Sequence, residues 1–271
     1  MQSNVKLAFA GGGNMAQAMI SGLVAHGCSA ARLRVADPDS QKLQEIFHRF
    51  GVSIFEENRA AVSPANVVVL AVKPGLVPTV LEEISPVLAP DALVISIAAG
   101  VTLATLQRHL PAKQPVVRAM PNTPALVGEG ITVMIPAATC DSAKAETARN
   151  VLESMGEVVE IDNESLMDGV TALSGSGPAY VYLMLEALSD GGVACGLPRT
   201  LADKLAVKTM LGSAKLVQES GKHPAILKNQ VTSPAGTTIA ALLELEKAGL
   251  RGTLMQAVMA AWQRSRQLGA S

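Results

Sequence analysis

Aromatic residues and cysteines are scarce in this chain, and neither sign of charge predominates. Aromatic residues make up 3% of the 271 residues, so aliphatic side chains and alanine must fill the interior, as a hydrophobic content of 49% allows. The formal net charge of −1 lacks the basic patch of a nucleic-acid or anionic-membrane binder, so we expect neither as a partner. A charged fraction of only 17% excludes an intrinsically disordered chain.

Disulfides, metal sites and membrane anchors also find little support in the sequence. Cys28, Cys140 and Cys195 are too far apart to form a disulfide framework or a metal-ligand pair, which is typical of a reducing compartment. No charged segment precedes the apolar run Val5–Ala10 as in a signal peptide. The longest apolar run elsewhere, Ala92–Val101, is shorter than the ~18 residues of a membrane span. We expect a cytoplasmic protein without a metal ion.

Short aliphatic runs alternate with helical patterns in residues 1–162. Most runs are continuous rather than alternating in hydrophobicity, so both faces of the strands should be covered. This alternation, with short connections, predicts an α/β fold with a Rossmann-type, doubly wound parallel sheet. The expected strands are Val5–Ala10, Leu33–Ala36, Val67–Val72, Leu93–Ala98, Val116–Met120, Ile131–Ile135 and Val158–Ile161, and the expected helices are Asn14–His26, Ser40–Phe50, Leu76–Leu88, Leu103–His109 and Ser142–Met155.

Residues 163–271 have a different character and are expected to form an all-α domain, because no β-branched run bounded by turns appears there. The tripeptide Ser176–Pro178 is typical of a cap and first turn for a helix over Ser176–Cys195. That helix is apolar almost all round until Glu186, so it must be buried on several sides. We expect a second copy of the chain to cover it, in a dimerisation domain. The other expected helices are Glu164–Ala172, Arg199–Ser220, Thr238–Lys247 and Arg251–Leu268.

The run Val5–Ala10 leads directly into a G-x-G-x-x-A turn that opens a helical pattern. Gly11 allows a tight turn, Gly13 allows the backbone to approach a pyrophosphate, and Ala16 allows the helix to pack close to the strand. The pyrophosphate then binds the exposed N–H groups at the helix N-terminus. The sequence therefore predicts a dinucleotide site in residues 1–162.

Two charged residues follow expected strands at the edge where this dinucleotide would bind. Asp37 comes roughly 20 residues after the glycine turn, where a carboxylate accepts hydrogen bonds from the adenosine ribose and repels a 2′-phosphate. No arginine follows it, which favours NAD(H) over NADP(H); alternatively, Asp37 caps the helix Ser40–Phe50. Lys73 either contacts the ribose or phosphates of the cofactor or is a solvated lysine at a strand end.

Six blocks of sequence carry further information. They read G-x-G-N-M-A at 11–16, A-V-K-P at 71–74, S-I-A-A-G-V at 96–101, M-P-N-T-P at 120–124, L-S-G-S-G-P-A-Y at 173–180 and H-P-A-I-L-K-N-Q-V-T-S-P-A-G-T-T at 223–238. In this order, and over nearly the whole chain, they resemble the Δ1-pyrroline-5-carboxylate reductase family. The resemblance implies a Rossmann domain that binds NADPH or NADH, a helical domain that interlocks with that of a second copy, and the final step of proline biosynthesis.

The resemblance also assigns residues to the two ligands. On the substrate side, Glu164, Thr237 and Thr238 would lie at pyrroline-5-carboxylate, while Ser233 and Gly236 would shape the same loop. The family often uses NADPH, whereas Asp37 favours NAD(H), so the choice between NADPH and NADH stays open. The implied cofactor residues are the phosphate loop (Ala10, Gly11, Gly12, Gly13, Asn14 and Met15), Asp37 at the ribose, Asn58, Ala71, Val72, Lys73 and Pro74, and, near the nicotinamide, Ile97 and Ala99.

Reduction of a cyclic imine, the reaction that the resemblance implies, needs a hydride donor and an electrophilic carbon. Such an imine can enter already protonated, so no strong protein acid is required and the protein mainly orients the reactants. We expect N–H groups at the start of the helix after Ser233–Gly236 to bind the substrate carboxylate. The Thr238 hydroxyl would bond to the ring nitrogen, orienting the substrate without transferring a proton. Plain N-capping is the alternative role for Thr237 and Thr238.

Two other functions are compatible with a dinucleotide site. A β-hydroxyacid dehydrogenase needs a base, typically a lysine on the helix after the interdomain boundary, and Ser174–Cys195 contains no lysine. A non-catalytic dinucleotide sensor needs the phosphate loop but gives no reason for the blocks at 173–180 and 233–238. The sequence therefore favours the reductase.

Overall fold

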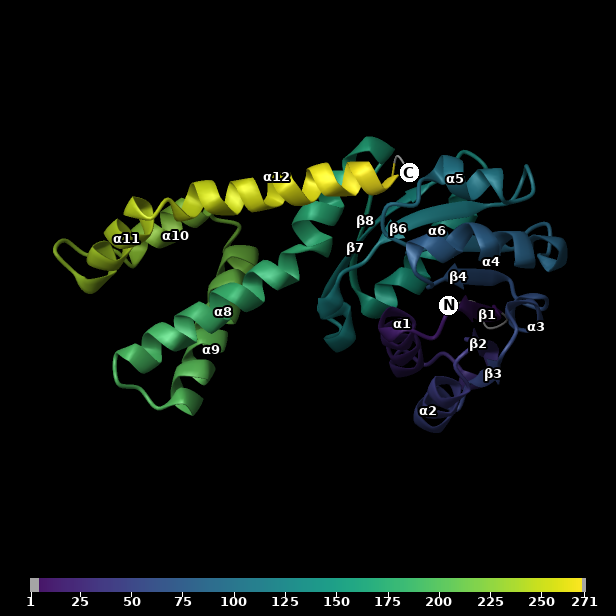
Figure 1. Ribbon diagram of the computed structural model, residues 1–271, viewed down its shortest axis with the longest axis horizontal. Coiled ribbons are helices and arrows are strands. Elements are labelled where there is room, and N and C mark those ends of the chain that lie inside the picture. Colours follow the sequence, from purple (N-terminus) through teal and green to yellow (C-terminus); the bar gives the residue numbers. More distant parts are fainter. Residues whose placement is uncertain (1–4, 270–271) are drawn as a thin grey trace. The chain divides into compact units, whose positions relative to one another are not determined.

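The computed structural model describes residues 5–269, which form two compact units (Figure 1). One unit comprises the chain up to Ser176 together with the residues from Ala261 onward, and the other comprises Gly177–Ala260. Among the described residues, none of the helices is both long and apolar enough to cross a membrane.

An eight-stranded sheet forms the centre of the first unit, in the order β3-β2-β1-β4-β5-β6-β7-β8. All neighbouring strands pair in parallel except β6 and β7, which are antiparallel. Every residue of β1, β4 and β5 is buried, because continuous apolar strands suit a sheet that is covered on both faces. The strands are β1 (Leu7–Ala10), β2 (Leu33–Ala36), β3 (Ser53–Phe55), β4 (Val67–Leu70), β5 (Leu93–Ser96), β6 (Val116–Met120), β7 (Gly130–Pro136) and β8 (Gly156–Glu160).

Helices cover both faces of this sheet and create its two larger hydrophobic cores. The first core contains apolar side chains of α1 (Asn14–Ala25), α2 (Ser40–Phe50) and α6 (Ser142–Leu152). The second contains those of α3 (Asn58–Val62), α4 (Val77–Ile84) and α5 (Leu103–Arg108). This arrangement confirms the α/β fold with a doubly wound sheet.

One strand and one helix of this unit are not predicted from the sequence. Strand β3 has only three residues and pairs with β2 alone, at the edge of the sheet. Helix α3 has only five residues. Neither is long enough to show a hydrophobic period, and both lie between α2 and β4.

The segment after β8 departs from the expected pair of separate helices. A 3₁₀ turn (Glu164–Leu166) and α7 (Met167–Val170) lead into a π-helical turn over Thr171–Gly175. The N–H of Ser176 donates to the carbonyl of Thr171 at 2.8 Å, so Ser176 continues the helix instead of capping a new one. The expected cap at Ser176 is therefore wrong, because a π turn carries the chain straight into α8 (Gly177–Ala194).

The second unit is all helical. Helices α8 and α9 (Arg199–Ser220) form a hairpin, at whose turn Arg199 donates to Ser189 Oγ at 2.9 Å and pairs with Asp190 at 2.7 Å. Helices α10 (Pro224–Gln230), α11 (Thr237–Lys247) and the first part of α12 (Leu250–Gly269) complete it. Ser189 is the only buried residue of α8, whereas Leu183 is 67% exposed. The expected burial of α8 is therefore not met within one chain.

Candidate active site

The glycine turn after β1 lies against the end of β4. Gly11 has a φ of +99°, and a Cβ atom there would lie 2.7 Å from the carbonyl oxygen of Ala71. The N–H of Ala71 in turn donates to the carbonyl of Ala10 at 2.8 Å. Gly13 is the N-cap residue of α1 and offers no side-chain cap, so the first N–H groups of α1 can bind a pyrophosphate.

Asp37 follows β2 and faces this turn. Its Oδ2 accepts a hydrogen bond from the N–H of Gly12 at 2.9 Å, and its Oδ1 accepts from the N–H of Asp39 at 3.0 Å and from Lys42 Nζ at 2.9 Å. Burial raises the pKa of Asp37, but the donors from Gly12, Lys42 and Asp39 lower it by more, so the pKa lies below its ordinary value. The cap of α2 is Asp39, which accepts from the N–H of Lys42, and not Asp37.

The other expected cofactor residues lie at or after the carboxyl ends of the strands, where ligands bind in doubly wound sheets. The N–H of Ile97 donates to the carbonyl of Leu70 at 3.2 Å, so the ends of β4 and β5 meet there. Lys73 is exposed. Asn58 at the start of α3 donates a hydrogen bond to Glu83 of α4 at 2.8 Å. Among the described residues, no hydrogen bond links the Asn58 side chain to the glycine turn.

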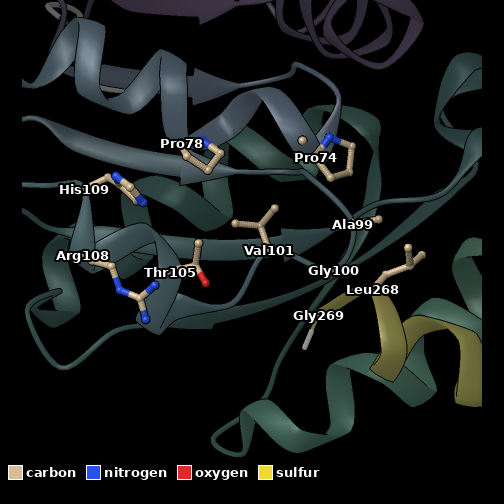
Figure 2. A pocket seen from close by; sticks show the side chains of 11 residues that line it. Pro74, Pro78, Ala99, Gly100, Val101, Thr105, Arg108, His109, Leu268 and Gly269 are labelled. Carbon is tan, nitrogen blue, oxygen red and sulfur yellow. The ribbon is translucent and has the colours of Figure 1, made fainter. Parts of the chain in front are cut away.

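A cavity of about 560 Å³ lies beside Pro74 and Ala99, two of the expected cofactor residues. The start of α4, Thr105 and Arg108 of α5, and the end of α12 line it, all within the first unit. Figure 2 shows Arg108 of α5 at one end of the cavity and Leu268 of α12 at the other. The cavity therefore adjoins the loop after β5, which was expected to meet the nicotinamide.

Glu164, expected at the substrate, is engaged by two donors of the first unit. Its Oε1 accepts from Arg118 Nη1 at 2.7 Å and from the N–H of Leu103 at 2.7 Å. Leu103 is the first residue of α5, whose preceding loop carries Ile97 and Ala99. Glu164 thus ties that loop to β6, through an arginine that is only 5% exposed.

Arg118 is not among the site residues predicted from the sequence. The available signal was a single charged residue inside the apolar strand V-V-R-A-M, because a buried charge requires a partner. The partner, Glu164, is too distant in sequence to be identified from spacing.

The other residues expected at the substrate lie in the second unit, in the turn before α11 and in the first two residues of that helix. Ala235 has a φ of +56°, which makes it the only non-glycine residue with positive φ among the described residues. A Cβ atom at Gly236 would lie 3.2 Å from the carbonyl oxygen of Ser233 and closer to its Oγ. Gly236 is the N-cap of α11, and no side chain caps the helix, so Thr237 and Thr238 do not serve as N-caps. The first N–H groups of α11 can therefore bind a carboxylate.

Known proteins resemble the chain over nearly its full length. Residues 164–268 match the family model for pyrroline-5-carboxylate reductase dimerisation, and residues 6–100 match that for NADP oxidoreductase, coenzyme F420-dependent. Pyrroline-5-carboxylate reductase of Pseudomonas aeruginosa is 42% identical over 266 residues, which cover 98% of this chain and 97% of that protein.

Two solved structures extend this similarity to three dimensions. A pyrroline-5-carboxylate reductase from Coxiella burnetii has a TM-score of 0.90 and 37% identity, covering 97% of this chain and 98% of that one. Plasmodium falciparum pyrroline carboxylate reductase with NADP bound has a TM-score of 0.91 and 34% identity, covering 99% and 100%. The chain therefore belongs to the pyrroline-5-carboxylate reductase family of NAD(P)H-dependent oxidoreductases.

Proposed function

We propose that the chain reduces L-Δ1-pyrroline-5-carboxylate to L-proline with NAD(P)H, the last step of proline biosynthesis. Hydride from the cofactor forms a C–H bond at C5, the C=N double bond becomes single, and the ring nitrogen keeps the proton that it carries as an iminium. The observation that carries the proposal is the presence, in one chain, of an open glycine turn after β1 and an uncapped α11 behind a strained turn. The full-length similarity to reductases of this name supports it.

The residues have distinct proposed roles. The N–H groups that follow Gly13 bind the pyrophosphate, and those that open α11 bind the substrate carboxylate, helped by the helix dipole. The half-buried Thr238 donates or accepts one hydrogen bond at the ring nitrogen and fixes the face of the ring that is presented. When bound, NAD(P)H supplies the hydride, and the protein contributes orientation.

We further propose a functional boundary at residue 162, a cytoplasmic location, and self-association through the C-terminal helices, without a nucleic-acid partner. The match to a dimerisation model and the exposed apolar side chains of α8 and α9 support self-association. Three free cysteines support a reducing compartment, and a net charge of −1 argues against nucleic acid.

The proposed reaction is tested by following absorbance at 340 nm with purified protein, pyrroline-5-carboxylate and either NADPH or NADH. We expect oxidation of the cofactor that depends on pyrroline-5-carboxylate, with L-proline as the product. If both cofactors bind and neither is oxidised, the reductase proposal is wrong, and the sensor or hydroxyacid dehydrogenase becomes the better account.

Thr238→Ala should lower kcat by about 10- to 1000-fold, because it removes one polar contact to the transition state. Thr238→Ser, which keeps the hydroxyl, should retain most of the activity, and both variants should bind the cofactor normally. Loss of all detectable activity in a folded Thr238→Ala variant would show that the hydroxyl acts as an essential acid.

A double-mutant cycle separates two roles for Glu164, a direct substrate contact and a tie that positions the loop before α5. If Glu164 acts through Arg118, the effects of Glu164→Gln and Arg118→Met on kcat/KM should overlap, with a coupling free energy of about 1–3 kcal/mol. Additive effects would instead assign Glu164 its own contact with the substrate. Glu160→Gln, which breaks the more exposed pair with Arg149, is the matched control and should leave kcat/KM unchanged.

A further inference from the structure

Lys42 occupies a position that sequence spacing did not connect with the cofactor. Its Nζ lies 2.9 Å from Asp37 Oδ1, although the two residues are separated by the start of α2. Because side chains of a helix tilt toward its N-terminus, a lysine in the first turn of α2 points back toward the end of β2. Its side chain remains 35% exposed, so the ammonium group can reach a ligand at this edge.

Asp37 has little capacity left for a ribose. A carboxylate offers about four acceptor positions, and three are used by the N–H groups of Gly12 and Asp39 and by Lys42. Its charge is compensated by Lys42, and its side chain is 8% exposed. The side chain therefore supports the glycine turn and presents a weaker negative potential to a 2′-phosphate than an unpaired aspartate does.

Unlike the carboxylate of Asp37, the ammonium group of Lys42 has hydrogen-bonding capacity left for a ligand. It carries three N–H donors, of which Asp37 takes one. Among residues 5–269, the only other carboxylate that forms an ion pair with it is Asp39, whose Oδ2 lies 4.0 Å away. A phosphate on the 2′-oxygen of an adenosine bound beside Asp37 would meet these free donors. Charge-assisted hydrogen bonds of this kind are among the stronger ones in proteins.

We infer that Lys42 is the residue that lets this chain accept the 2′-phosphate of NADPH despite the aspartate at the end of β2. The inference rests on the proposed function only in placing the adenosine ribose beside Asp37. It argues against the preference for NAD(H) drawn from the lack of an arginine after Asp37, because α2 places a lysine at the same point.

The inference is tested with nucleotide fragments, which need no catalysis. Binding of adenosine 2′,5′-bisphosphate and of 5′-AMP to the full chain is measured by calorimetry for wild type, Lys42→Ala, Lys42→Arg and Lys144→Ala. Lys144 is the matched control, because it holds the same helix position after the N-cap Asp141 of α6 and takes no part in the site.

Lys42→Ala should weaken the bisphosphate by about 10- to 100-fold, the effect of one charged hydrogen-bonding partner, and change 5′-AMP by less than about 2-fold. Lys42→Arg should retain the bisphosphate, and Lys144→Ala should match wild type. The ratio of kcat/KM for NADPH to that for NADH should fall in Lys42→Ala by the same factor.

The inference is overturned if Lys42→Ala weakens both fragments equally or neither, or if the wild type binds 5′-AMP at least tenfold more tightly than the bisphosphate. Failure of both fragments to bind would remove the adenosine site and the inference with it. A selective loss for the bisphosphate, in a protein that does not reduce pyrroline-5-carboxylate, would sustain the role of Lys42 while contradicting the proposed reaction.

Discussion

The close approach of Gly11 to the end of β4 is the contact on which the proposed site depends. A φ of +99° turns the chain sharply out of β1, and the missing side chain lets it lie against the carbonyl of Ala71. The turn directs the first N–H groups of α1 along the edge of the sheet to which β2 brings Asp37 and β5 brings Ile97. The order of the strands therefore determines which edge of the sheet can bind the ligand, whatever side chains lie there.

Two of the carboxylates expected at the site are paired with cations. Asp37 is held by Lys42 and the glycine turn, and Glu164 is held by Arg118 and the start of α5. A reaction that adds hydride to an already protonated imine suits such a site, since it needs orientation more than proton transfer. The second unit adds an uncapped helix at Thr237 and apolar surfaces that one chain leaves exposed.

Much of this architecture could be predicted from the sequence, and the failures have physical causes. Continuous apolar strands predicted the buried sheet, and the glycine spacing predicted the turn after β1, because both are local signals. The three-residue β3 and the π turn at Thr171–Gly175 have no comparable period or cap. The partners of Arg118 and Asp37 were missed because spacing along the chain does not show which side chains a helix or strand brings together.

The central claim, that the dinucleotide binds at the turn after β1, is tested most directly by measuring NADPH binding to Gly11→Ala with calorimetry. We expect binding weaker by at least about tenfold in a folded protein, since an added methyl is strained at this φ and must push the turn away from Ala71. Unchanged affinity, with an unfolding transition like that of the wild type, would contradict it and place the dinucleotide elsewhere.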